Sequence, residues 1–346
     1  MGVIEELQSR RVPLATLPTP LESARTLPSG RRLLIKRDDL TGLGIGGNKA
    51  RKAEMLCAEA VTAGADALVT VGAAQSNHAR VTAAAGARLG LETHLVRGGS
   101  SAGPRQGNQL LAELFGATLH DGATDSWTEL ARRMDDLVAE LRSAGRRPYA
   151  VPLGGSTAVG ASAFVLAWCE LLEQLDCEHH DVAAVVIASS TGGTHAGMLA
   201  GRALFGGPPV VAIDVAKASD DLAGDTRQLA DETLALLGSA EHVNPADVLV
   251  DPRFVGPAYA VPTPEAHAAL VGLARCGGWV LDRVYSAKGF AGLPAREAEE
   301  SFGDGDVVFW HTGGQPALFA AGGAPPLGFA SDVLSSRSLS LDMERP

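Results

Sequence analysis

The sequence predicts an α/β fold of two domains, built from parallel twisted sheets that carry helices on both faces. Apolar, strand-like runs alternate with helical patterns along most of the chain. One run, VAAVVIASS at 182–190, is almost unbroken, as in strands that are buried on both faces. A chain of 346 residues is too long for one ordinary core, and a hydrophobic content of 46% allows sizeable cores.

The first half of the chain contains four expected strands, at 67–72, 93–97, 117–120 and 148–152. Helical patterns separate them near 76–89, 108–115 and 126–144. Gly90 and Gly145 follow two of these patterns and are typical helix stops. Helical crossovers between successive strands predict a parallel sheet.

The second half repeats this style. Strands are expected at 182–190, 209–215 and 306–312, and helices near 195–205, 220–237, 264–276 and 289–301. No period of about 20–50 residues recurs, so a solenoid is excluded. The chain from about 322 is rich in glycine and proline and then in serine and charge, which predicts a flexible tail at 326–346.

The composition excludes several classes of protein. A net charge of −11 does not suit a phosphate backbone, so no nucleic-acid partner is expected. The N-terminus, MGVIEELQSRR, has no basic segment followed by an apolar run, so no signal peptide is expected. No apolar run approaches ~18 residues, which argues against a membrane span. We therefore expect a cytoplasmic protein.

The four cysteines indicate a reducing compartment, since they are scattered over the chain rather than arranged as a disulfide framework. They form no C-x-x-C pair, so no metal site is expected. We expect most of them to be buried as small apolar residues. They are Cys57, Cys169, Cys177 and Cys276.

The first candidate for chemistry is the glycine-rich turn TGLGIGGNKARK at 41–52, in which Lys49 opens a helix. Positive potential at a helix start lowers the pKa of a lysine and favours the neutral amine that a Schiff base requires. Two other interpretations stay open. Gly42, Gly44 and Gly47 match the dinucleotide fingerprint, which would indicate a nicotinamide oxidoreductase. In the second alternative interpretation, Lys49 is simply a solvated lysine in a loop.

The second candidate is GAAQSNHAR at 72–80, where a strand meets a helix. Ser76, Asn77 and the free N–H groups of the helix start make a site for a carboxylate. Alternatively, Ser76 or Asn77 is only a helix cap, and His78 is a capping or core histidine.

The third candidate is SSTGGTHAG at 189–197, directly after the apolar strand. Successive N–H groups and hydroxyls with a helix dipole behind them form a phosphate cradle. The turn lacks a lysine and therefore suits the single phosphate of a cofactor. A tight turn that needs glycine for steric reasons is the alternative. The residues concerned are Thr191, Gly192, Gly193 and Thr194.

Polar residues at the ends of two later segments complete the candidate site. Tyr285 and Ser286 precede a helix in RVYSAKGFAGL, and Thr312 ends a strand in WHTGGQPALF. Tyr259 lies in a Gly/Pro loop, where a ring with a polar tip often serves a site. A structural role is an equal alternative for both tyrosines.

The order of these motifs resembles the D-cysteine desulfhydrase and aminocyclopropane-carboxylate deaminase family. Its members are pyridoxal phosphate (PLP) enzymes of fold type II, the tryptophan-synthase β-subunit type. The resemblance extends over 18–319, and the combination of GGNK-x-RK with QSN is its most specific part. It implies a large domain of 1–49 and 158–325 that binds the cofactor, and a small domain of 50–157 that closes over the substrate.

The resemblance also implies roles for individual residues. Lys49 corresponds to the Schiff-base lysine, and Asn77 to the residue at the ring hydroxyl of PLP. Ser76 is implied at the substrate carboxylate, in a substrate site formed with Asn77 and His78. Gly192, Gly193 and Thr194, with Thr191, correspond to the phosphate loop. Tyr259 and Tyr285 match active-site tyrosines, and Thr312 matches the residue at the pyridine nitrogen.

Departures from the deaminase branch favour the desulfhydrase branch. The deaminase branch has Gln and Glu where this chain has His78 and Ser286. The expected function is α,β-elimination from D-cysteine, giving pyruvate, sulfide and ammonia. Aminocyclopropane-carboxylate deamination, elimination from cysteate, D-serine or chloroalanine, and a biosynthetic role without desulfhydrase activity stay open. Family precedent implies a small amino-acid substrate and a homodimer.

Overall fold

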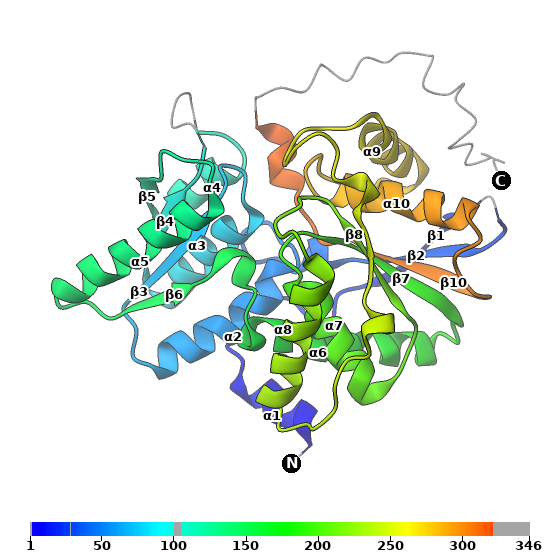
Figure 1. Ribbon diagram of the computed structural model, residues 1–346, viewed down its shortest axis with the longest axis horizontal. Coiled ribbons are helices and arrows are strands. Elements are labelled where there is room, and N and C mark those ends of the chain that lie inside the picture. The colour runs from blue at the N-terminus through cyan, green and yellow to red at the C-terminus, as the bar shows by residue number, and fades with distance from the viewer. Residues whose placement is uncertain (1, 28, 100–104, 321–346) are drawn as a thin grey trace.

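The computed structural model describes residues 2–27, 29–99 and 105–320, and the predicted tail at 326–346 lies outside them. The described strands form one sheet of six strands and one of four. Figure 1 shows the two sheets on opposite sides of the molecule, each lined by helices. The predicted α/β class is confirmed. The division into domains at 50 and 157 stays a prediction.

The smaller sheet is parallel throughout, as predicted. Its strand order is β5 (Thr118–Asp121), β4 (Glu92–Arg97), β3 (Ala67–Gly72) and β6 (Pro148–Val151). The crossovers contain α3 (Asn77–Leu89), α4 (Asn108–Leu114) and α5 (Trp127–Ser143). Ser76 caps α3, and Gly90 ends it in the left-handed conformation.

The larger sheet is parallel except at one edge. Its order is β1 (Leu21–Thr26), β2 (Arg32–Lys36), β10 (Asp306–Trp310), β7 (Val182–Ser189), β8 (Val210–Asp214) and β9 (Leu249–Asp251). The expectation of purely parallel sheets is wrong for β1, which pairs antiparallel with β2. The connection between them is too short for the crossover that a parallel pair requires.

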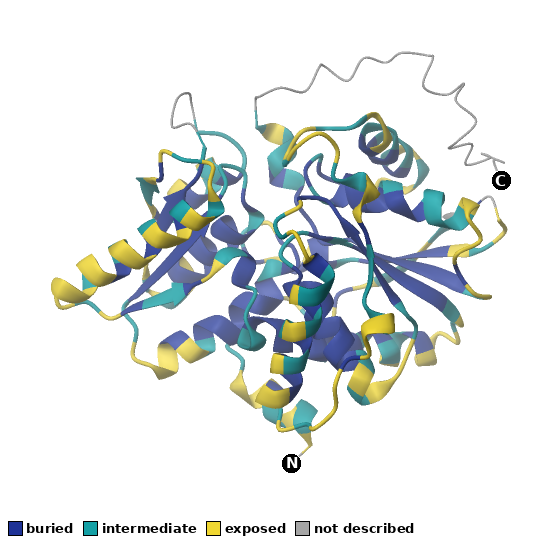
Figure 2. Cartoon of the chain, viewed as in Figure 1, coloured by how far each residue is buried: buried dark blue, intermediate teal, exposed yellow. Residues whose placement is uncertain are grey.

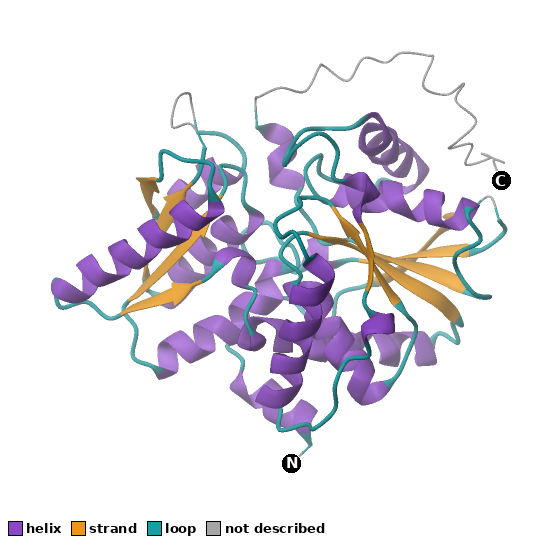
Figure 3. Ribbon diagram, viewed as in Figure 1, coloured by secondary structure: helices purple, strands orange, loops and turns teal. Residues whose placement is uncertain are grey.

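Helices cover both faces of the larger sheet, as Figures 1 and 3 show. One face packs against α6 (Ala158–Cys177) and α7 (Gly193–Phe205), with α8 (Leu222–Leu236) outside them. The other face packs against α9 (Pro264–Gly277) and α10 (Ser286–Ala298). Figure 2 shows the strands buried and the outer helix faces exposed. Apart from α2, which is described below, the remaining elements are α1 (Val3–Arg10) and the 3₁₀ turns at 38–40, 153–155, 245–247, 252–254 and 315–319.

Helix α6 is absent from the sequence prediction. It is apolar around most of its circumference and lacks the one-sided pattern that reveals a surface helix. By length and composition its 20 residues suffice to cross a membrane, which corrects the expectation that no run approaches that length. In the fold, 56% of the most apolar 18-residue stretch of α6 is buried, and Phe164 and Trp168 lie in the core against the sheet.

The expectation that most cysteines are buried is wrong. All four are free, but only Cys57 is buried. Cys169 and Cys276 are half-buried, and Cys177 is exposed. The three lie in or at the end of helices whose other faces supply the core, so their sulfur atoms remain near the surface.

Helix α2 (Lys49–Thr62) joins the two sheets and packs against both α6 and α3. The buried guanidinium of Arg51 anchors it. Nε of Arg51 lies 3.0 Å from both carboxylate oxygens of Asp38, and its terminal nitrogens lie 2.8 and 2.9 Å from those of Glu170. Lys36 donates to the same Glu170 carboxylate at 2.5 Å. This ion cluster connects β2, α2 and α6.

We predict that Arg51→Met lowers the free energy of unfolding by about 3–5 kcal/mol, because the buried carboxylate of Asp38 loses its ion-pair partner and Glu170 retains Lys36 but loses the guanidinium. Urea denaturation measures this. Arg132→Met is the matched control, since Arg132 is 58% exposed on α5 and pairs only with surface carboxylates. It should cost less than about 1 kcal/mol. Equal losses in the two variants would contradict the anchoring role.

Candidate active site

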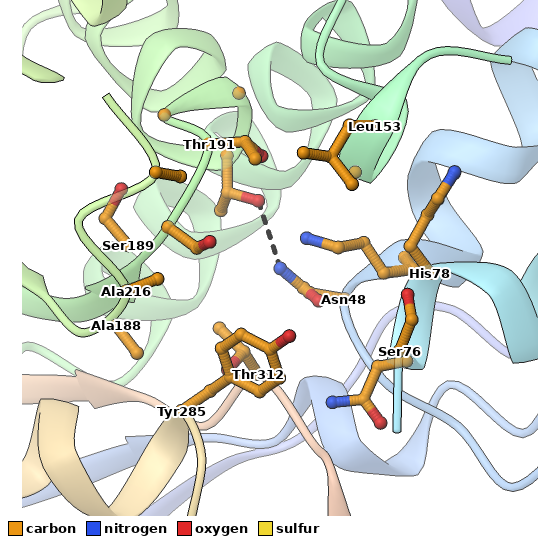
Figure 4. A pocket seen from close by; sticks show the side chains of 18 of the residues that line it. Asn48, Ser76, His78, Leu153, Ala188, Ser189, Thr191, Ala216, Tyr285 and Thr312 are labelled. Atoms are coloured by element: carbon orange, nitrogen blue, oxygen red, sulfur yellow. Dashed lines mark hydrogen bonds between the residues drawn. The ribbon is translucent and has the colours of Figure 1, made fainter. Parts of the chain in front are cut away.

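One cavity, formed where α2, α3 and α7 begin and β7 and β10 end, brings together the residues that the sequence analysis assigns to the site, with the exception of Ser286. Figure 4 shows side chains from these separate segments facing the same space. Their individual roles stay predictions. The predicted residues that line the cavity are Lys49, Ser76, Asn77, His78, Thr191, Gly192, Gly193, Thr194, Tyr259, Tyr285 and Thr312.

Lys49 is the first residue of α2, and its side chain lines the cavity. Its amine makes no hydrogen bond or ion pair with any described residue. Burial alone lowers the pKa of Lys49 to about 8. Roughly a tenth of the amine is therefore unprotonated at pH 7, far more than for an ordinary lysine, and can act as a nucleophile. The interpretation of Lys49 as a solvated loop lysine is wrong.

The glycines before Lys49 shape a tight turn. Gly46 has a φ of +71°, and a Cβ there would clash with the carbonyl oxygen of Asp39. The turn is held by Asn48, whose N–H donates to the carbonyl of Thr312 at 3.0 Å. A 3₁₀ turn at 38–40 separates β2 from α2, so the strand does not lead directly into the helix. This geometry does not fit a dinucleotide fingerprint.

The start of α3 offers donors to an anion. Ser76 does cap the helix, because its Oγ accepts from the N–H of Ala79 at 3.1 Å, and it also lines the cavity. Asn77 Oδ1 accepts from Nδ2 of Asn108 at 2.9 Å. This leaves Nδ2 of Asn77 available to donate to a ligand.

His78 is a buried, neutral member of the cavity wall. Thr70 donates its hydroxyl proton to the carbonyl of Val151 at 2.6 Å, so it accepts from Nε2 of His78 at 2.9 Å. This fixes the proton on Nε2 and leaves Nδ1 as an acceptor. Burial, with the charges of Lys49 and Lys52, lowers the pKa of His78 to about 3. The interpretation of His78 as a helix cap finds no support.

The turn before α7 approaches two polar groups from another segment. Gly192 has a φ of +74° and serves as the N-cap of α7 without a side-chain cap. A Cβ at Gly193 would lie 2.5 Å from Oγ of Ser156 and 2.6 Å from Nζ of Lys52. Asn48 also reaches this turn, since its Nδ2 donates to Oγ1 of Thr194 at 3.0 Å (Figure 4). The glycines therefore allow a tight turn and also let the backbone approach Ser156 and Lys52 closely.

Lys52 and Ser156 are residues that the sequence analysis missed. Nζ of Lys52 is buried and donates to the Gly154 carbonyl and the Ser156 hydroxyl at 3.2 and 3.3 Å. No carboxylate among the described residues pairs with it. Burial and the charge of Lys49 hold its pKa well below the usual range. The sequence did contain a signal for Lys52. It lies three residues after Lys49, and this spacing puts both lysines on one face of a helix.

A buried lysine amine without a counter-charge, beside free helix N–H groups, fits a phosphate group. A buried charge without a counter-charge is costly, and a phosphate would supply it. The N–H groups of the first turn of α7 have no side-chain cap and are suited to phosphate oxygens. The residues present therefore fit a phosphorylated cofactor.

Tyr259 and Tyr285 share a short hydrogen bond between their hydroxyls. Burial raises the pKa of Tyr259 to about 12 and holds the pKa of Tyr285 well above its ordinary value. Both phenols are therefore neutral near pH 7. Asp282 positions Tyr285, because its Oδ2 accepts from the N–H groups of Val284 and Tyr285 at 2.8 and 2.9 Å.

The two hydroxyl residues considered for the cofactor ring nitrogen are placed differently. Ser286 is buried outside the cavity lining, and its Oγ donates to Oδ1 of Asp282 at 2.6 Å. Thr312 lines the cavity, and its hydroxyl has no partner within the described part of the chain. Only Thr312 therefore offers a side chain to a ligand.

Comparisons with known proteins match most of the chain. The model of the family "pyridoxal-phosphate dependent enzyme" matches residues 12–313. The D-cysteine desulfhydrase of Klebsiella pneumoniae (strain 342) is 38% identical over 320 residues, which are 90% of this chain and 95% of the relative. The D-cysteine desulfhydrase of Yersinia enterocolitica is 38% identical over 324 residues, covering 90% and 96%.

Solved structures show the same architecture. The crystal structure of an ACC deaminase homologue superposes with a TM-score of 0.84 at 33% identity, covering 92% of this chain and 97% of the other. A fungal L-serine ammonia-lyase from Rhizomucor miehei superposes with a TM-score of 0.63 at 20% identity, covering 89% and 96%. The second likeness concerns the fold alone.

We predict that Gly193→Val weakens retention of pyridoxal phosphate roughly tenfold to a hundredfold, because the added side chain displaces Lys52 and Ser156 from the turn. Absorbance of the protein after dialysis measures retention. Gly272→Ala, in open space on α9, is the control and should change neither retention nor stability appreciably. Normal retention by Gly193→Val would exclude this turn as the phosphate site.

Proposed function

The chain belongs to the family of pyridoxal-phosphate dependent enzymes, and we propose that it converts D-cysteine to pyruvate, sulfide and ammonia. The proposal is supported by the two D-cysteine desulfhydrases that are 38% identical over nearly their whole length. The observation that carries it is the lining of the cavity. Within the described residues, Lys49 and Thr312 line this cavity, but no aspartate or glutamate does.

We propose that Lys49 binds the cofactor covalently as a Schiff base. The N–H groups of 191–194 and the ammonium of Lys52 hold the phosphate. Asn77 donates to the ring hydroxyl, and the hydroxyl of Thr312 meets the ring nitrogen. When bound, pyridoxal phosphate supplies an electron sink for the negative charge that develops at the substrate Cα.

The remaining residues bind the substrate and move protons. The substrate carboxylate accepts hydrogen bonds from Ser76 and the first N–H groups of α3. Lys49, once its amine is released, removes the proton from Cα. The hydroxyl pair of Tyr259 and Tyr285 serves as the proton donor to the departing sulfide. Water completes the conversion to pyruvate and ammonia, so atoms balance.

The absence of an acid from the described cavity lining favours D-cysteine over aminocyclopropane-carboxylate. A thiol has an ordinary pKa of about 8.5 and leaves readily. Ring opening must break a carbon–carbon bond and needs a ring nitrogen kept protonated by a carboxylate. Asp282 does not meet that need, because its oxygens are already occupied by hydrogen bonds from 284–286.

We further propose that the enzyme is a cytoplasmic homodimer acting on a free amino acid, without a nucleic-acid or membrane partner. The four free cysteines support a reducing compartment. The family resemblance supports the dimer. We also retain the proposal of a small closing domain at 50–157, since the four-stranded sheet lies wholly within 67–151.

The purified enzyme should release sulfide and pyruvate in equal amounts from D-cysteine and give little or no α-ketobutyrate from aminocyclopropane-carboxylate. Colorimetric sulfide and keto-acid assays measure this. Lys49→Ala is the control and should lose at least about a thousandfold in rate, because proton abstraction and the covalent link both depend on the amine. Robust α-ketobutyrate with no sulfide would overturn the proposal.

A further inference from the structure

We propose that Trp127 is a specificity-determining residue, which limits the size of the group on the substrate Cβ. This inference rests on the proposed function for the orientation of the substrate. Trp127 lines the cavity, but no motif in the sequence drew attention to it. It lies on α5, a helix that otherwise packs on the four-stranded sheet.

The first turn of α5 fixes the position of the indole. Ser126 caps the helix, with its Oγ accepting from the N–H of Glu129, and its own N–H donates to Oγ1 of Thr124 at 3.1 Å. Trp127 continues the apolar stripe of Leu130 and Met134, which are buried against the sheet. The indole thus projects from a well-anchored helix end.

Three aromatic rings form a continuous wall from this helix to the start of α10. The indole of Trp127 meets the ring of Tyr259 edge to face, with centroids 5.8 Å apart and planes at 83°. The rings of Tyr259 and Tyr285 follow at 6.1 Å, and their hydroxyls are hydrogen-bonded. Edge-to-face geometry is the favoured arrangement of such pairs. Trp127 therefore also braces Tyr259, which lies in a turn.

The four substituents of the substrate Cα leave one direction for its side chain. The amino group meets the cofactor, the carboxylate meets the start of α3, and the Cα hydrogen faces Lys49. The aromatic rings are the largest side chains in the described cavity lining, and the proposal directs the group on Cβ toward Trp127 and Tyr259. A thiol, hydroxyl or chloride fits against this wall, whereas a longer or aromatic side chain collides with the indole.

The test compares Trp127→Ala and Trp127→Phe with the wild type in the binding of D-alanine, D-norvaline and D-phenylalanine. Binding is followed by the change in absorption of the bound cofactor, so the readout does not require turnover. Thr128→Ala is the matched control, because Thr128 is the exposed neighbour on the same helix turn. Both enantiomers of each amino acid are measured.

Trp127→Ala should raise the affinity for D-norvaline relative to D-alanine by about tenfold or more, as expected when a pocket gains space for extra methylenes. Trp127→Phe should give an intermediate ratio, and Thr128→Ala the wild-type ratio. An unchanged ratio in Trp127→Ala, or a parallel loss of affinity for all three ligands, would overturn the proposal.

The binding measurements on the Trp127 variants and the sulfide assay test two separate claims, and either claim can be wrong while the other stands. If the enzyme releases no sulfide but Trp127→Ala widens the range of amino acids bound, the proposed function is wrong and the specificity role stands. If sulfide is released and the size ratio stays at the wild-type value, the specificity role is wrong. A preference for L-amino acids would send the side chain in another direction and would overturn the specificity role.

Discussion

Helix α2 is held in place by Arg51, whose buried guanidinium lies between the buried carboxylate of Asp38 and the partly buried carboxylate of Glu170. The neighbouring Glu54 adds a second anchor by accepting from the N–H groups of Leu14 and Ala15 at 2.8 Å. These anchors fix the rotation of the helix about its axis. Lys49 and Lys52, three residues apart, are consequently both directed toward the cavity side.

The cavity that results is positive within an acidic protein. The chain as a whole has a net charge of −11, but the described cavity lining includes Lys49 and no carboxylate, and Lys52 lies directly behind its glycine turn. His78 stays neutral because burial, together with the charges of Lys49 and Lys52, opposes its protonation. The starts of α3 and α7 contribute further positive potential. Such a site demands anionic ligands, which suits both a phosphate and an amino-acid carboxylate.

Local patterns in the sequence predicted most of the described strands, although not β1 and β9, as well as most helices and many residues around the cavity, because each motif lies where a strand meets a helix. Helix α6 was missed because burial on most sides removes its amphipathic pattern. Lys52 and Trp127 were missed because their importance arises from contacts with Gly193 and Tyr259, which are distant in sequence. The sequence alone does not distinguish Ser286 from Thr312 as a partner of the cofactor. The structure does, because the hydroxyl of Ser286 donates its proton to Asp282.

The central claim is that α2 presents Lys49 to the cofactor as its covalent partner and Lys52 to the phosphate as its counter-charge. Borohydride reduction of the purified holoenzyme, followed by proteolysis and mass spectrometry, tests it most directly. The account predicts a single reduced pyridoxyl adduct on the peptide that contains Lys49, at Lys49 itself. An adduct at Lys52, Lys36, Lys217 or Lys288 would contradict it.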